Sequence, residues 1–112
     1  MTVRTPSPRD NLAQKVRDLL ASHQNVREVR MFGGVSFMVD ERMAVAAGRD
    51  GDLLVRTDPA EYDDLLLRGG VPAHMGGDRP MGPGWLTVPG ERITDQADLA
   101  FWIQVGIGSK TR

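Results

Sequence analysis

The sequence has 112 residues, a formal net charge of −1 and no cysteine, and it contains 13 glycines and 7 prolines. This length fits one domain, and the missing cysteine excludes disulfides, thiolate nucleophiles and cysteine-based metal sites. The near-neutral charge lacks the basic field of a nucleic-acid-binding domain, and the apolar runs are far too short for a membrane span. Because the N-terminal segment MTVRTPSPRD has no apolar signal-peptide core, we expect a cytoplasmic protein.

A first helix is predicted to begin after Ser7, which can cap it, with Pro8 at the first helical position. Its apolar stripe recurs at helical spacing and consists of Leu12, Val16, Leu19 and Leu20. The helix is expected to end near residues 23–25, because asparagine at position 25 suits the left-handed residue after a helix. His23 would then lie at the helix end, where a capping role is favoured.

The hydrophobic period changes to two from Val26 onward, which predicts a run of short strands. They are expected near residues 26–32, 35–39, 43–47 and 53–57. Gly33 and Gly34 separate the first two, and one of these glycines is expected to take a positive φ. Connections this short favour an antiparallel meander.

The second half of the chain is predicted to contain two more helices around a long loop. One helix opens at residues 58–61 with a cap and a proline, and it stops at the glycine pair 69–70. Residues 71–84 are rich in glycine and proline, so they predict a loop that adds at most an irregular edge strand. A strand at residues 85–88 precedes the last helix, which is expected to start at Thr94 and Asp95.

The last helix is expected to end at Gly106 and Gly108, which leaves residues 109–112 frayed. Its predicted apolar stripe consists of Leu99, Trp102 and Ile103, widened by Phe101 and Val105. The resulting order is α-β-β-β-β-α-(β)-β-α. It indicates a single two-layer α+β domain over residues 1–112, with an antiparallel sheet of about five to six strands and helices packed on one face. Residues 1–6 and 109–112 are expected to be flexible.

No group of residues in the sequence has the pattern of a catalytic or metal site. The two histidines, His23 and His74, are distant in sequence and have no third ligand at helical or hairpin spacing. His74 lies in the Gly/Pro-rich loop, where functional groups often occur. The glycine-rich stretches lack both the spacing of a phosphate-binding loop and a helix that opens behind it. We therefore expect no cofactor and no metal.

The segment MFGGVSF, which contains Met31, Phe32, Gly33 and Gly34, resembles the N-terminal domain of the TfoX/Sxy family, regulators of bacterial competence. Supporting similarities lie in residues 43–45, in the strand and acid at 53–58, in MGPGWLTVP at 81–89, and in Leu99 with Trp102. The resemblance covers roughly residues 10–108 and implies an α+β fold with a non-enzymatic regulatory role. Full-length members append a C-terminal helical domain that this sequence lacks, so we expect a stand-alone domain.

The leading hypothesis is a regulatory domain that acts by protein–protein contact, including contact with a second copy, through an unpaired sheet edge. The alternative is a small anionic-ligand binder or minor enzyme that uses the loop at residues 71–85. The candidate ligand or partner residues are His74, Arg79, Trp85, Arg56 and Arg30. A third hypothesis, direct nucleic-acid binding, would need a basic stripe made of Arg27, Arg30, Arg56 and Arg68; the near-neutral charge disfavours it.

Overall fold

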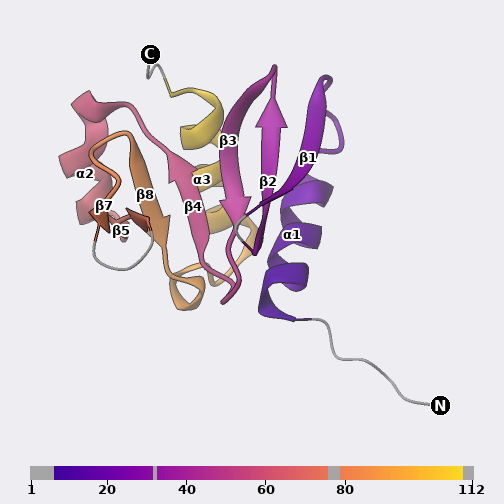
Figure 1. Cartoon of the computed structure of the whole chain (residues 1–112), viewed down its shortest axis with the longest axis horizontal. Helices are drawn as coiled ribbons and strands as arrows, with labels where there is room; N and C mark the ends of the chain where they lie inside the picture. Colours follow the sequence, from indigo (N-terminus) through magenta and orange to yellow (C-terminus); the bar gives the residue numbers. More distant parts are fainter. Residues whose placement is uncertain (1–6, 32, 76–78, 110–112) are drawn as a thin grey trace.

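The structure is a computed structural model that describes residues 7–31, 33–75 and 79–109 (Figure 1). The α-helices are α1 (Pro8–Leu19), α2 (Tyr62–Leu67) and α3 (Gln96–Ile107). The strands are β1 (Val26–Met31), β2 (Gly34–Val39), β3 (Arg42–Ala47), β4 (Leu53–Arg56), β5 (Val71–Pro72), β6 (His74–Met75), β7 (Arg79–Pro80) and β8 (Trp85–Val88). Short 3-10 turns, η1 (Pro59–Glu61) and η2 (Gly90–Arg92), precede α2 and α3.

Six strands form one antiparallel sheet in the order β1-β2-β3-β4-β8-β5. The predicted meander of β1 to β4 is confirmed, and so is the edge strand β5, which the Gly/Pro-rich segment contributes. β6 and β7 pair separately as a small two-stranded sheet. The turn between β2 and β3 has two residues, Asp40 and Glu41, both with positive φ (53° and 67°), as in the hairpin turn whose twist matches that of the strands.

All three described helices lie on one face of the large sheet (Figure 1). α1 packs against β2 and β3, and α3 packs against β3 and β4. α2 lies beside α3, where the Arg68 guanidinium stands 5.3 Å from the centre of the Phe101 ring. The predicted class, a two-layer α+β domain with helices on one face, is confirmed.

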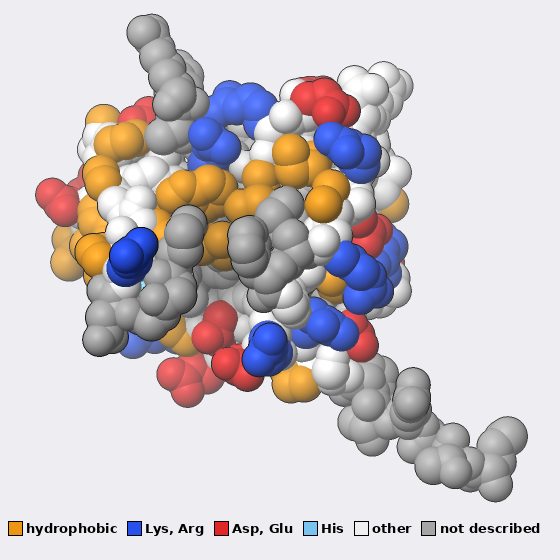
Figure 2. Space-filling model, in the orientation of Figure 1, with side chains coloured by type: hydrophobic (Ala, Val, Ile, Leu, Met, Phe, Trp, Pro, Cys, Tyr) orange, Lys and Arg blue, Asp and Glu red, His pale blue; other side chains and the backbone are white. Residues whose placement is uncertain are grey.

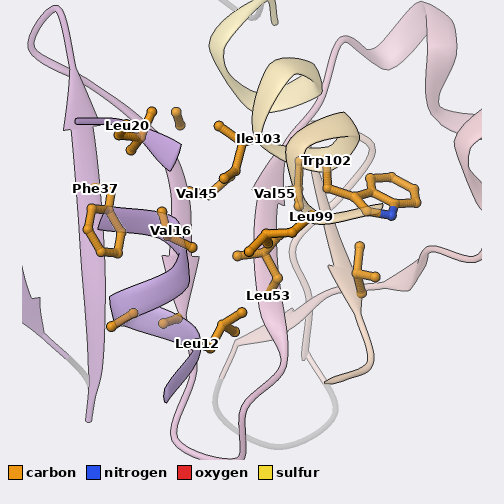
Figure 3. Packing of buried hydrophobic residues seen from close by; sticks show 14 of the residues in the cluster. Leu12, Val16, Leu20, Phe37, Val45, Leu53, Val55, Leu99, Trp102 and Ile103 are labelled. Carbon is orange, nitrogen blue, oxygen red and sulfur yellow. The ribbon is translucent and has the colours of Figure 1, made fainter. Parts of the chain in front are cut away.

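The core lies between the sheet and the helices (Figure 3). Phe37, Val45, Val55 and Leu86 are direct neighbours on successive strands, and each is 0% exposed. The helices cover this row with buried side chains that include Val16, Leu99, Trp102 and Ile103. Removing such side chains from water, at about 25 cal/mol per Å² of apolar area, is the main force that holds the two layers together.

The first helix ends earlier than the sequence predicts. α1 stops at Leu19, and the amide of Ala21 donates to the Asp18 carbonyl in a tighter turn. The apolar stripe ends at Leu20, so further helix would bury nothing. His23 therefore lies beyond the helix rather than at its end. Asn25 does take the left-handed conformation, with φ of 60°, but it leads directly into β1.

Three expectations for the C-terminal region are wrong. Gly106 does not end α3 but lies inside it, because it is the point of close contact with β3. Phe101 is 38% exposed and stands beside α2 rather than in the buried stripe. Ser109 is buried rather than frayed, and its hydroxyl donates to the Gly106 carbonyl at 3.0 Å. The expectations for residues 1–6 and 110–112 lie outside the described residues.

Candidate functional site

The glycine pair between β1 and β2 is a structural turn. Gly33 has a φ of +77°, which confirms the predicted positive φ. A Cβ atom on Gly34 would lie 2.7 Å from the Ala47 carbonyl oxygen on β3, so this position needs glycine for a different reason, which is close packing. The Arg9 guanidinium of α1 donates to the Gly33 carbonyl at 3.1 Å and joins the turn to the helix layer. Phe32 and the Met31 side chain lie outside the described residues.

Arg56 and Trp85, two of the predicted ligand or partner residues, lie side by side on β4 and β8. The Arg56 guanidinium stands 5.2 Å from the centre of the Trp85 ring, a distance at which a cation is attracted to an aromatic face. Both residues are partly buried. Their side chains extend from the face of the sheet that does not contact the helices, because their neighbours Val55 and Leu86 face the core.

The other candidates lie elsewhere. His74 and Arg79 are exposed and sit diagonally across the β6–β7 pair, since His74 is opposite Pro80. Arg30 lies on β1, at the far edge of the large sheet from β8 and β5, and its side chain is on the helix side. The structure thus groups these residues as Arg56 with Trp85 and His74 with Arg79, with Arg30 apart. Their role in ligand binding stays a prediction.

The described residues hold no group of three or more histidine or acidic side chains placed for a metal ion. Among the same residues, no helix is both long and apolar enough to cross a membrane.

A continuous row of residues crosses the face of the sheet opposite the described helices, which we call the helix-free face. The strand register places its members next to one another from β1 to β5, in the order Val29, Ser36, Ala46, Leu54, Thr87 and Val71. We call this set the cross-sheet row. Ser36 and Ala46 in its centre are 3% and 8% exposed, whereas the other four are partly exposed. The row was not foreseen, because alternation within a strand does not reveal which residues become neighbours on other strands.

Methionines lie beside the cross-sheet row on the same face. Met38 on β2 is opposite Arg27 on β1 and Met43 on β3, and both methionines are partly exposed. Arg27 on β1 borders the methionines, and Arg56 with Trp85 lies on the same face, on β4 and β8. Figure 2 shows this face, with hydrophobic side chains gathered over the middle of the sheet and charged side chains around its border.

The outer edge of the sheet at β1 carries a second set of charges. On the helix side, Glu28 accepts two hydrogen bonds from Arg17 of α1, at 2.6 and 2.7 Å. The Arg17 hydrogen bonds hold the pKa of Glu28 below its usual value. Burial opposes this shift, and the charges of Arg17 and Arg30 add to it. On the other face of the strand, Arg27 pairs with Glu41 at 2.8 Å.

The fold therefore defines a small two-layer α+β domain with one sheet face free of described helices. Residues 18–109 match the family model described as the TfoX N-terminal domain, and the chain belongs to that family. No curated protein and no solved structure was found to match the chain.

Proposed function

We propose that this chain is a non-enzymatic regulatory domain that binds another protein through the helix-free face of its sheet. The observation that carries the proposal is the set of partly exposed apolar side chains on this face, which are Val29, Leu54 and Val71 of the cross-sheet row and the adjoining Met38 and Met43. Apolar patches of this kind, rimmed by polar residues, are typical of protein–protein interaction sites. Methionine side chains adapt to irregular partner surfaces.

The chemistry of this face defines the partner that would fit it. The partner would present apolar side chains to the partly exposed members of the row and to the methionines, and polar side chains to the rim, where Arg27 pairs with Glu41 and Arg56 lies against Trp85. Membership in the TfoX N-terminal domain family supports transcription or competence as the regulated process. A bacterial cytoplasm, expected from the sequence, is part of the same proposal.

The test is capture of a partner from native cytoplasm, followed by reconstitution of the complex from purified proteins. Leu54→Glu places a charge at a partly exposed position of the cross-sheet row, and we expect it to abolish binding. Leu67→Glu is the matched control, because Leu67 is 87% exposed on α2 in the helix layer; it should bind as wild type does. Thermal melting of both variants would show that they fold. A folded Leu54→Glu variant that retains full binding would contradict the proposal.

A further inference from the structure

The geometry points to a second copy of this chain as the partner of the outer edge of β1. We propose that two copies pair their β1 strands antiparallel about a two-fold axis at Val29, which joins two six-stranded sheets into one. This interface uses the edge of the sheet rather than the face that the proposed function assigns to another protein, so neither depends on the other.

The first step concerns which backbone groups of β1 face outward. The Asn25 carbonyl accepts from the Asp40 amide at 3.1 Å, so this opposed pair is hydrogen-bonded. Hydrogen-bonded and non-bonded pairs alternate along an antiparallel ladder, so Arg27 and Val29 direct their amides to β2. Glu28 and Arg30, together with Val26, then direct their amides and carbonyls away from β2, to the outer edge of β1, where no other described strand pairs.

The β2–β3 turn supports the same assignment. Its two-residue form makes Val39 and Arg42 a hydrogen-bonded pair, so the backbone groups of Val39 point to β3. Val26, which lies opposite Val39 on β1, is therefore in a non-bonded pair on that side and faces outward.

The second step concerns the register of the two copies. Outward residues of one β1 must lie opposite outward residues of the other, which restricts a two-fold pairing to registers centred on single residues. Centring the axis on residue 27, 28 or 30 places Arg27, Glu28 or Arg30 directly opposite its own copy, and like charges in that position destabilise a pair. Centring it on Val29 places valine opposite valine and Glu28 opposite Arg30 twice.

The charges at this edge also oppose unspecific pairing. Charged side chains on an edge strand usually serve to block association. Here they disfavour the registers centred on residues 27, 28 and 30 and favour the register centred on Val29, because Glu28 and Arg30 are two residues apart and opposite in sign. The pattern is therefore self-complementary rather than uniformly repulsive.

The surroundings of β1 are compatible with this pairing. Glu28 and Arg30 lie on the helix side, where α1 packs mainly against β2 and β3 and reaches β1 through the Arg17–Glu28 pair. Glu28 would then stand between Arg17 of its own chain and Arg30 of the second copy. On the opposite face Val29 begins the cross-sheet row, so the pairing would extend that row across both copies.

The first experiment compares charge variants by sedimentation equilibrium over a wide concentration range. Arg30→Glu alone and Glu28→Arg alone each replace two favourable pairs by two repulsive ones, so each should dimerise about tenfold more weakly than wild type. An equimolar mixture of the two variants should form a heterodimer with near wild-type affinity, because opposite charges again face each other. Arg27→Glu, the matched control on the other face of the strand, should dimerise as wild type does.

The second experiment needs no variant. Amide hydrogen exchange of the wild-type chain should slow at Glu28 and Arg30 as the concentration rises, while Arg27 and Val29 are protected at every concentration. The inference would be overturned if the wild-type chain stayed monomeric at several hundred micromolar, or if the exchange rates at Glu28 and Arg30 did not depend on concentration. It would also be overturned if the mixed variants associated no more tightly than each variant alone. A monomer that still binds a partner through Leu54 would overturn this inference alone, whereas a dimer without a partner would overturn the proposed function alone.

Discussion

Two adjacent glycines, one in the turn after β1 and one at the start of β2, meet different physical requirements. Gly33 has a left-handed backbone at φ +77°, and its missing Cβ leaves room for the flexible guanidinium of Arg49. Gly34 lacks a positive φ, but a side chain there would press against the carbonyl of Ala47, which is held in the β3 ladder. The sequence predicted that one glycine would have a special conformation. It did not reveal that the other is a contact between strands.

Gly34→Val should lower the free energy of unfolding by about 1–3 kcal/mol, because overlap with a backbone carbonyl cannot be relieved by rotating a side chain. Urea denaturation measures this difference. Gly33→Asn is the comparison, since asparagine tolerates a left-handed backbone and Arg49 can move aside; it should cost less than about 1 kcal/mol. Equal stability of Gly34→Val and wild type would refute the close-packing explanation.

At the scale of elements, the Arg17–Glu28 pair ties α1 to the edge strand β1. The guanidinium donates from two nitrogens to both carboxylate oxygens, although the side chains are 44% and 36% exposed. Sequence spacing could not show this pair, because eleven positions and a turn separate the two residues. Both lie at polar positions of amphipathic elements, where any of several partners is equally compatible with the pattern.

The pair should give the chain a pH-dependent stability below pH 5. The pKa of Glu28 in the folded chain lies below the usual value of 4.5 for a glutamate side chain. The ionised Glu28 side chain therefore stabilises the folded state above pH 4.5. This stabilisation is lost as the pH falls through the lower pKa that Glu28 has in the folded chain. Arg17→Gln should reduce the loss of stability between pH 6 and pH 3 by less than about 1 kcal/mol, since the pair is exposed to solvent.

Urea denaturation at the two pH values measures the change, and Lys15→Gln on α1 controls for the loss of one positive charge. A variant that loses Arg17 and keeps the full wild-type pH dependence would mean that other carboxyl groups account for it.

At the scale of the whole molecule, the fold class and the order of elements were predictable because each element carries its own signal. Ser7 caps α1 by accepting from the Asp10 amide, and Asp95 caps α3 in the same way at Asp98. The core face of the strands followed from alternation, as at Val55 and its partly exposed neighbour Leu54. The cross-sheet row and the spacing of the two layers were not predictable, because both depend on contacts between residues distant in sequence.

Gly106 sets the spacing between α3 and the sheet, and replacing it tests how closely α3 must approach β3. A Cβ at this position would overlap the Ala44 carbonyl oxygen of β3 and lie 3.0 Å from a methyl group of Val45. Alanine is favoured over glycine within a helix by about 1 kcal/mol, yet overpacking against a backbone costs about 1–3 kcal/mol. We expect packing to prevail, so Gly106→Ala should lower the free energy of unfolding measured in urea.

Gln104→Ala, an exposed position of the same helix, should leave that stability within about 0.5 kcal/mol of wild type. If Gly106→Ala were instead more stable than wild type, helix propensity would outweigh the contact and α3 would be free to move away from β3. The close approach would then be a result of the core packing around Leu99 and Ile103 rather than of the glycine.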